Sequence, residues 1–544
     1  MTNYQFTGGT ICAPATIPGT GAISIIRVSG KESLAIADKV IDTKGVPIAE
    51  TEGYRLRYGT VFEADGSVLD NVIVSVFRAP HSYTGENSVE ISCHASRFIV
   101  NKILELLVNA GARIAAPGEF TRRAFVNGKM DLAQAEAVAD VIASQSAASH
   151  RVAMNQLKGG FSSELKVLRE KLLTMTSLLE LELDFSEEDV EFASRKELGQ
   201  LVDDSLTHIG RLTASFSRGN AIKNGVPVAI VGATNTGKST LLNALLGEER
   251  AIVSDIAGTT RDTIEETLNI DGILFRFIDT AGIRETDETI EKIGIDRTFK
   301  KLGEAAVVLG MTDLSRGEAA VLEDADFILS KVNEMGGMKN VGTENDGSET
   351  SGASKAEMDG ASLAETGGAS RHGHGDGQER KVVILVNKCD VAGSFYKDDN
   401  GTDYGSGNDL GKNMAEIGGN KNVNHDNNIV SLIENKYDNC KVIPISAKTG
   451  KGLSTLTKTL GEIGSEITGS TDETLVTNVR HYEALVRAAS ALERVRAGLH
   501  IATLPPDLIA QDLREALYHL GEIVGEITTD ETLGNIFRNF CVGK

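Results

Sequence analysis

A glycine-rich segment at 232–239 has the residue types and spacing of a phosphate-binding loop. It reads GATNTGKS, shares its first glycine with the apolar run VPVAIVG and leads into STLLNALLG, which is typical of a helix. Glycines let backbone N–H groups surround phosphate oxygens, and the start of a helix adds positive potential. We predict that Lys238 bridges the β- and γ-phosphates and that Ser239 ligates Mg²⁺. A chance glycine-rich turn is the alternative, and the flanking strand and helix disfavour it. The nucleotide contacts expected here are Asn235, Thr236, Gly237, Lys238, Ser239 and Thr240.

Three further motifs follow predicted strands in the order of a GTP-binding domain. DTAG at 279–282 comes after ILFRFI, NKCD at 387–390 ends KVVILVN, and SAK at 446–448 ends KVIPIS. Asp279 can hold the magnesium shell, Gly282 can donate its N–H to the γ-phosphate, and a backbone N–H of the SAK motif can reach the guanine carbonyl. Asp390 can accept from two guanine donors that adenine lacks. The guanine contacts expected are Asn387, Lys388, Asp390, Ser446, Ala447 and Lys448. Four motifs in this order, each at the carboxyl end of a strand, predict GTP binding.

The segment DIAGTTRD at 255–262 supplies a threonine that binds Mg²⁺ when the γ-phosphate is present. A Ras-like enzyme carries a glutamine near position 283 to orient water, whereas this chain has Ile283. We therefore expect help for hydrolysis to come from elsewhere in the protein.

Composition limits the remaining chemistry. The chain has 544 residues, of which 41% are apolar and 24% charged, with a net charge of -22. Such an acidic chain is poorly suited to hold nucleic acid by its own charge, so a second protein is expected to supply a basic surface. Five scattered cysteines form neither a disulfide framework nor a zinc motif, which suits a reducing cytoplasm. We see neither a signal peptide nor an apolar run long enough to cross a membrane, so no membrane partner is expected.

Four stretches that differ in their pattern of apolar and polar residues predict the organisation of the chain. Residues 1–128 alternate β-rich runs with a helical stretch and indicate an α/β domain; residues 129–224 and 466–544 are helical. Residues 225–465 alternate apolar strands with helices, the pattern of a parallel doubly wound sheet. We predict one helical domain interrupted by a Ras-like P-loop domain, rather than four independent domains. Residues near 333–380 and 392–428 are rich in Gly, Asn, Asp and Ser, which predicts disordered insertions.

Three segments together resemble one family. GTTRD at 258–262, PGEFTRRAFVNGKMDLAQAEAVADVI at 117–142 and the ending CVGK at 541–544 resemble MnmE, also called TrmE. The resemblance covers nearly the whole chain except the two insertions. This bacterial GTPase modifies the wobble uridine of certain tRNAs. The resemblance implies addition of an aminomethyl-type (carboxymethylaminomethyl) group to uridine C5, with GTP hydrolysis driving conformational change.

The family also implies ions, partners and a catalytic residue. Its members form homodimers whose GTPase domains pair in a potassium-dependent way, and they assemble with a flavin-containing MnmG-type partner into a heterotetramer. That partner would contribute the redox chemistry and most of the tRNA contact. The matching catalytic glutamate is Glu291. The matching ion ligands are Ser239 and Thr260 for Mg²⁺, and Asn235, Ser254, Ile256 and Thr259 for K⁺, with Ser254 standing where many members have threonine.

The N-terminal domain of this family carries a tetrahydrofolate one-carbon donor and takes part in dimerisation. The matching contacts are Arg27, Glu90, Lys129 and Lys544, and Cys541 is a candidate reactive thiol. These residue types suit the ligand, because cations can meet the folate glutamate and a carboxylate can pair with the donor edge of the pterin.

Two other functions have parts of the same sequence pattern. A ribosome-assembly GTPase shares the DxxGTTRD segment, but such proteins carry a second GTPase domain or a KH module, and neither is found in this sequence. A nucleotide-gated scaffold would bind GTP with negligible turnover.

Overall fold

The computed structural model describes residues 8–184, 194–249, 266–278, 305–334, 380–390, 429–437, 440–469, 474–500, 505–538, 540 and 543. The chain divides into two compact units. One comprises 1–144, 149–216 and 471–544, and the other comprises 145–148 and 217–470. Most of both predicted insertions falls outside the described residues. The proposed domain boundaries at 128, 224 and 465 stay predictions.

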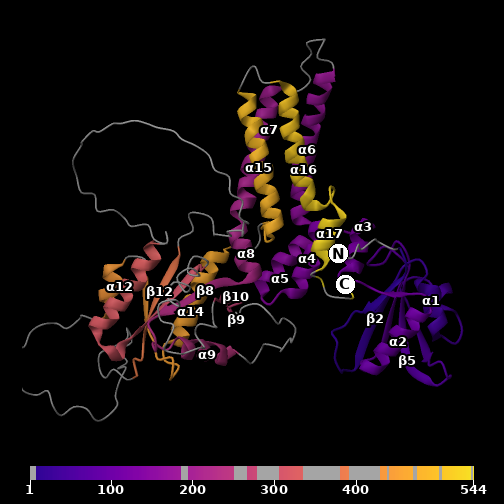
Figure 1. The fold of residues 1–544 in the computed structure, drawn as a ribbon, viewed down its shortest axis with the longest axis horizontal. Helices are drawn as coiled ribbons and strands as arrows, with labels where there is room; N and C mark the ends of the chain where they lie inside the picture. Colours follow the sequence, from indigo (N-terminus) through magenta and orange to yellow (C-terminus); the bar gives the residue numbers. More distant parts are fainter. Residues whose placement is uncertain are drawn as a thin grey trace, which may run out of the picture. The chain divides into compact units, whose positions relative to one another are not determined.

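A seven-stranded, mostly antiparallel sheet forms the N-terminal part of the first unit, drawn in indigo in Figure 1. Its order is β3-β4-β5-β6-β2-β1-β7. Alternate residues of the central strands are buried, as a half-covered sheet requires. The strands are β1 (Ile11–Pro14), β2 (Ile23–Ser29), β3 (Ile41–Asp42), β4 (Arg55–Phe62), β5 (Val68–Phe77), β6 (Ser88–His94) and β7 (Arg113–Ile114). Helices α1 (Ser33–Val40) and α2 (Arg97–Asn109) pack on one face, and α3 (Glu119–Val126) follows β7.

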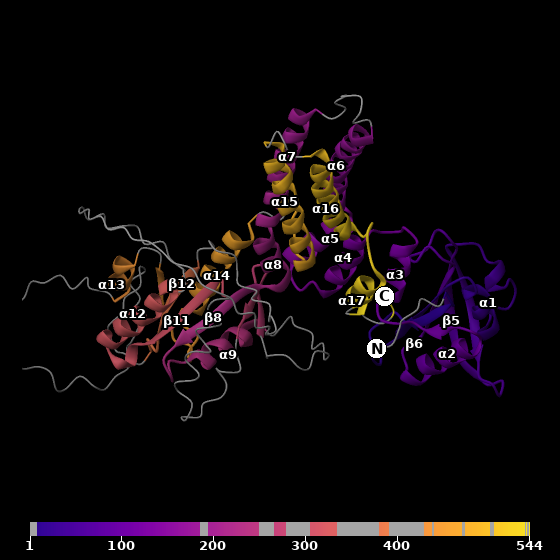
Figure 2. The ribbon, with the colours of Figure 1, turned by 45° about the horizontal axis from the view of Figure 1, so that its top comes forward.

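The helical part of the same unit is built from two distant segments of the chain. Its helices are α4 (Leu132–Ala143), α5 (Ala147–Leu157), α6 (Gly160–Asp184), α7 (Arg195–Ala214), α15 (Val479–Leu499), α16 (Pro506–Val524) and α17 (Asp530–Arg538). Leu172 and Ile209 from before the interruption share one core with Leu485 and Leu513 from after it. Figure 2 shows α15 and α16 beside α6 and α7. The predicted helical domain, interrupted by the second unit, is therefore confirmed.

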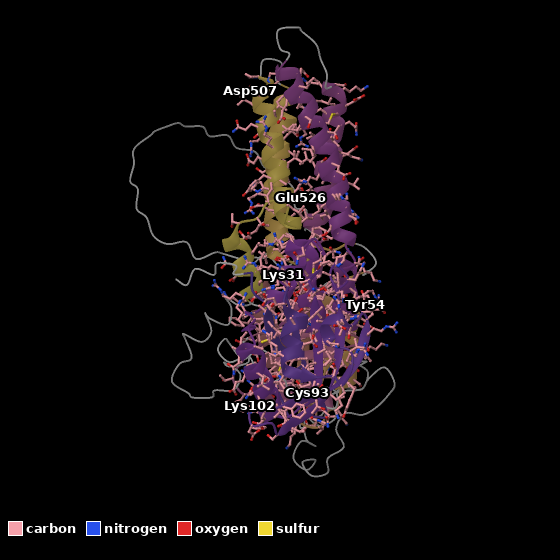
Figure 3. The ribbon with its side chains drawn as sticks, turned by 90° about the vertical axis from the view of Figure 1, so that its right-hand side faces the viewer. Lys31, Tyr54, Cys93, Lys102, Asp507 and Glu526 are labelled. Atoms are coloured by element: carbon pink, nitrogen blue, oxygen red, sulfur yellow. The ribbon has the colours of Figure 1, made fainter. Side chains whose placement is uncertain are left out.

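Local signals set the ends of these helices. Pro506 lies in the first turn of α16, and Gly525, with φ 86°, ends the helix in the left-handed conformation that glycine adopts most readily. Figure 3 labels Asp507 and Glu526 at the two ends of α16. Asp131 caps α4 by accepting a hydrogen bond from the backbone of Gln134.

The second unit holds a six-stranded sheet in the order β13-β12-β11-β8-β10-β9. The strands are β8 (Val226–Gly232), β9 (Glu266–Ile270), β10 (Ile273–Phe277), β11 (Val307–Asp313), β12 (Lys381–Asn387) and β13 (Cys440–Pro444). Helices α8 (Phe216–Asn224), α9 (Lys238–Glu249), α12 (Glu318–Glu334), α13 (Ile429–Lys436) and α14 (Leu453–Thr468) accompany them. Two apolar cores cover its two faces, one with α9 and α14 and the other with α12 and α13.

The predicted α/β fold class is confirmed, with one local difference. Strand β9 runs antiparallel to β10, whereas the other neighbouring strands are parallel. The reason is the short turn between β9 and β10, in which Asp271 and Gly272 have φ 51° and 81°. Such a turn reverses the chain directly, while a parallel neighbour needs a longer crossover.

Among the helices that the structure describes, none is long and apolar enough to cross a membrane.

Candidate functional site

The predicted phosphate-binding loop joins the end of β8 to the start of α9. Asn235 and Gly237 have φ 61° and 101°, conformations that asparagine and glycine tolerate better than other residues. A side chain at Gly237 would also collide with the amide group of Asn387. Ser239 and Thr240 lie in the first turn of α9, half-buried and exposed respectively. The loop therefore has the curled backbone that a phosphate cradle requires.

Lys238 lies across this loop. Its Nζ donates hydrogen bonds to the carbonyl oxygens of Gly232 at 2.9 Å and Ala233 at 2.8 Å. Burial lowers the pKa of the Lys238 ammonium. An anion beside it would offset that desolvation, since an opposite charge favours the protonated form. The position suits a residue that contacts phosphate oxygens.

Asn387 connects the phosphate-binding loop to the guanine-binding motifs. Its side-chain nitrogen donates to the carbonyl oxygen of Thr236 at 2.7 Å, and its side-chain oxygen accepts from the N–H of Ala447 at 3.0 Å. Asn387 is only 3% exposed. The structure thus brings three of the four predicted motifs together through one buried amide.

Two N–H groups of the SAK motif donate to acceptors within the protein. The N–H of Ser446 donates to the carbonyl oxygen of Lys451, and that of Ala447 is taken by Asn387. Which N–H of the motif donates to the guanine carbonyl stays a prediction. Asp390 is exposed, in the turn directly after β12, where an incoming base can reach it.

Seven predicted residues of the nucleotide site lie outside the described residues: Ser254, Ile256, Thr259, Thr260, Asp279, Gly282 and Glu291. Their assigned roles stay predictions.

A second polar site lies on the N-terminal sheet. Arg27 on β2 and Glu90 on β6 occupy paired positions, and the Arg27 guanidinium contacts Glu90 Oε1 at 2.9 Å. The guanidinium carbon lies 5.3 Å from the ring centre of Tyr83 and 5.6 Å from that of Phe120. A half-buried ion pair beside two aromatic rings can bind a flat, polar ligand.

Lys129, predicted for the same site, has a different contact. Its Nζ donates to the carbonyl oxygen of Pro80 at 3.1 Å. The Lys129 stem also lies against Gly85, in the loop that carries Tyr83. Lys129 therefore borders the loop beside Arg27 instead of joining the Arg27–Glu90 pair.

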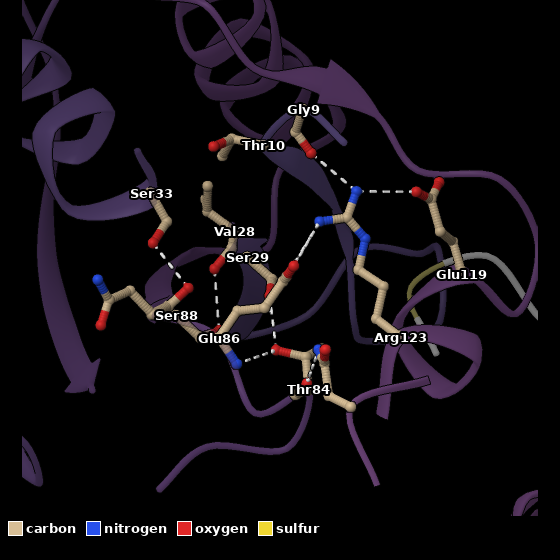
Figure 4. Close-up of polar contacts among 12 residues, drawn as sticks. Gly9, Thr10, Val28, Ser29, Ser33, Thr84, Glu86, Ser88, Glu119 and Arg123 are labelled. Atoms are coloured by element: carbon tan, nitrogen blue, oxygen red, sulfur yellow. Dashed lines mark hydrogen bonds and ion pairs between the residues drawn. The ribbon is translucent and has the colours of Figure 1, made fainter. Parts of the chain in front are cut away.

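Sequence reasoning missed a buried polar network next to this site, drawn in Figure 4. Arg123 on α3 is 1% exposed; it contacts Glu86 at 3.0 Å and 3.1 Å, Glu119 at 3.0 Å and the carbonyl of Gly9 at 2.7 Å. Ser29 adds a hydrogen bond of 2.9 Å to Glu86. The four-residue spacing of Glu119 and Arg123 in EFTRR (119–123) was the available signal. The network ties the loop that bears Tyr83 to α3.

The end of the chain packs against the N-terminal sheet. Gly543 is buried beside the carbonyl of Pro14 on β1, and Pro14 and its neighbour Ala13 pair with Ile26 and Arg27 on β2. Phe537 and Phe540 lie against Gly118 at the start of α3. Cys541 and Lys544 lie outside the described residues, so their assigned roles stay predictions.

Comparisons with known proteins agree over nearly the whole length. The family model "GTP-binding protein TrmE N-terminus" matches residues 10–129, and "MnmE helical domain" matches residues 132–541. A tRNA modification GTPase MnmE from Parabacteroides distasonis is 45% identical over 538 residues, covering 98% of this chain and 100% of that protein. The protein of the same description from Bacteroides thetaiotaomicron is 44% identical over 538 residues, covering 98% and 99%.

Proposed function

Because this chain belongs to the MnmE family of tRNA modification GTPases, we propose that it hydrolyses GTP to drive modification of the wobble uridine of certain tRNAs. The product is an aminomethyl-type (carboxymethylaminomethyl) group on uridine C5. The observation that most directly supports GTP binding is the buried Asn387 amide, which is hydrogen-bonded both to the predicted phosphate-binding loop and to the SAK motif.

Two metal ions are part of the proposal. Mg²⁺ would be held by Ser239 and Thr260, whose hydroxyl oxygens are hard ligands of the type that it prefers. Potassium would be held by Asn235, which is exposed at the loop, together with Ser254, Ile256 and Thr259. When bound, K⁺ supplies positive charge beside the phosphates. Glu291 would orient the attacking water, since Ile283 cannot.

A tetrahydrofolate one-carbon derivative is proposed as the ligand of the N-terminal site. The half-buried Arg27–Glu90 pair with Tyr83 and Phe120 beside it supports this choice, because a pterin is flat and has a polar edge. Lys129 and Lys544 would contribute positive charge toward the folate glutamate. Cys541 is proposed as a reactive thiol.

The proposed assembly is a homodimer that joins a flavin-containing MnmG-type partner in a heterotetramer. The net charge of -22 favours a tRNA contact made mainly by that partner, because phosphate recognition needs clustered basic residues.

The decisive experiment measures wobble-uridine modification by mass spectrometry of tRNA nucleosides from cells that lack this protein. The modified uridine is expected to be lost, to return with the wild-type gene, and to stay absent with Lys238→Ala. Lys458→Ala on α14, an exposed lysine of the same unit, is the matched control and should restore modification. Normal tRNA together with accumulated ribosomal precursors would instead favour a ribosome-assembly GTPase.

A further inference from the structure

Asp313 ends strand β11 at the same edge of the sheet as the nucleotide loops. It is buried, with its side chain 7% exposed. Its Oδ2 contacts Lys388 Nζ at 2.6 Å, while its Oδ1 accepts hydrogen bonds from the N–H of Ser315 at 3.0 Å and from the Ser315 hydroxyl at 2.6 Å. Both carboxylate oxygens therefore accept hydrogen bonds, and these bonds fix the orientation of the Asp313 side chain.

The ion pair keeps Asp313 charged. Burial alone would raise the pKa of this carboxyl, but the hydrogen bonds from Lys388 and Ser315 and the Lys388 charge outweigh burial and lower the pKa. A buried carboxylate is costly unless it is paired, so the position of Asp313 is closely tied to that of the lysine.

Lys388 belongs to the predicted guanine-binding motif, and its backbone has φ 65°. Position 388 directly follows Asn387, which pairs with Asp313 across the two parallel strands. Asn387 is anchored by its own bonds to Thr236 and Ala447. The backbone of the motif is therefore fixed without Asp313, and what Asp313 fixes is the Lys388 side chain.

We infer that Asp313 is a positioning residue for nucleotide binding, holding Lys388 in place before the nucleotide arrives. An ammonium group has three N–H donors, so the contact with Asp313 leaves others for the nucleotide. The lysine stem can lie on the face of a base, as such stems do on apolar surfaces. A flexible lysine side chain loses much rotamer freedom when it is ordered. Here Asp313 orders Lys388 before the nucleotide binds, so nucleotide binding does not bear that entropic cost.

The inference rests on the proposed GTP site, and the test separates the two. GDP and IDP affinities are measured by calorimetry on the full chain. Asp313→Asn should raise both dissociation constants about tenfold, the size expected for a charge-assisted hydrogen bond. The ratio of GDP to IDP affinity should not change. Asp390, not Asp313, is expected to recognise the amino group that inosine lacks, and the backbone of the motif is held without Asp313. Asp390→Asn should change that ratio.

Asp326→Asn is the matched control. Asp326 Oδ2 also contacts a lysine at 2.6 Å, Lys436, but this pair joins α12 and α13 on the surface. Its loss should leave both affinities unchanged.

A second experiment is a double-mutant cycle with Lys388→Met. Once Lys388 is absent, Asp313→Asn should weaken GDP binding no further.

Three outcomes would overturn the inference: wild-type GDP affinity in folded Asp313→Asn, fully additive losses in the cycle, or an altered GDP-to-IDP ratio. If Asp313→Asn does not fold, Asp313→Glu takes its place, since the longer side chain moves the carboxylate by one methylene; wild-type affinity there would likewise overturn the inference. An unchanged ratio in Asp390→Asn would instead disprove the proposed guanine site.

Discussion

The side-chain amide of Asn387 donates a hydrogen bond of 2.7 Å to the backbone oxygen of Thr236, although 151 positions separate the two residues. Through this bond, the predicted phosphate-binding loop and the strand that ends in the predicted base-recognition motif share one buried contact. Asn387 also accepts from Ala447, so the third loop of the site depends on the same side chain.

We expect Asn387→Ala to weaken GTP binding by at least about tenfold. The change leaves the Thr236 carbonyl and the Ala447 N–H without their partner, and each unsatisfied buried group costs about 1–3 kcal/mol. The variant should also unfold at a lower temperature. Nucleotide titration and thermal melting measure both effects. Asn224→Ala on α8 serves as the control, because that exposed amide donates to the side chain of Asn220 at the surface. Equal losses in the two variants would contradict the prediction.

Base choice is expected to depend on Asp390. Asp390→Asn should weaken GTP and admit xanthosine triphosphate, because the amide replaces an acceptor with a donor at the base edge. A hydrogen bond to a charged group contributes about 1.5–3 kcal/mol, so GTP affinity should fall roughly ten- to hundredfold. Competition between the two triphosphates measures the change, and unchanged GTP affinity would disprove the assignment.

Potassium should stimulate GTP hydrolysis strongly over sodium. Asn235→Ala should abolish this difference and keep most nucleotide binding, because its backbone N–H groups and Lys238 remain. Glu291→Ala should keep potassium-driven dimerisation and lose turnover. An arginine finger typically adds about 10³–10⁵ in rate, and a bound cation can supply comparable charge.

Phosphate release and sedimentation in potassium and sodium chloride at equal ionic strength separate these potassium effects. Asn224→Ala, an exposed amide on α8, is also the control for Asn235→Ala. Equal rates in the two salts, or full activity of Glu291→Ala, would disprove the proposed role of the ion or of the glutamate.

The folate proposal predicts that Arg27→Ala abolishes binding of a tetrahydrofolate derivative and spares GTP hydrolysis. Arg27 is paired with Glu90 at the proposed site, whereas Arg55 pairs with Glu52 on an exposed surface, so Arg55→Ala should leave both properties unchanged. Gly543→Ala should also weaken folate binding, because a methyl group there would collide with Pro14. Ligand fluorescence and GTP turnover are measured together, and a parallel loss of both in Arg27→Ala would indicate misfolding.

The helical domain should lose stability in acid through Glu136. This buried carboxylate of α4 contacts Arg480 Nε at 2.9 Å and His481 Nε2 at 2.7 Å, both on α15. Burial alone would raise the pKa of Glu136, but the charges and hydrogen bonds of His481 and Arg480 lower it from 4.5 to about 2. The folded-state pKa lies below the ordinary value, so the stabilisation is fully present above pH 4.5 and is lost as the pH falls toward 2.

Such a shift corresponds to roughly 3 kcal/mol at neutral pH. Glu136→Gln should therefore lower the melting temperature at neutral pH, and its difference from the wild type should shrink in acid. Glu105→Gln, which removes an exposed partner of Lys102, should have little effect at either pH. A difference that stayed constant with pH would contradict the prediction.

The sequence by itself determined the local parts of this protein. The phosphate loop, the turn after β12 and the SAK motif each combine a strand with a short run of defined residue types, so all could be recognised from one chain. The ends of α16 at Pro506 and Gly525 are local in the same sense, because helix caps depend on neighbouring residues. Membership of the family could likewise be predicted from GTTRD, the segment at 117–142 and the final four residues.

Only the tertiary structure decided which distant side chains meet. Nothing local in the sequence distinguishes Asp313 from any other aspartate that ends a strand, and its pairing with Lys388 arises because parallel β11 and β12 end at one edge. The contacts of Arg123 and the placement of Lys129 against Pro80 likewise depend on how α3 packs on the N-terminal sheet. Hydrogen bonds and ion pairs act over a few ångströms in space, so their partners emerge only when packing has set strand register and helix position.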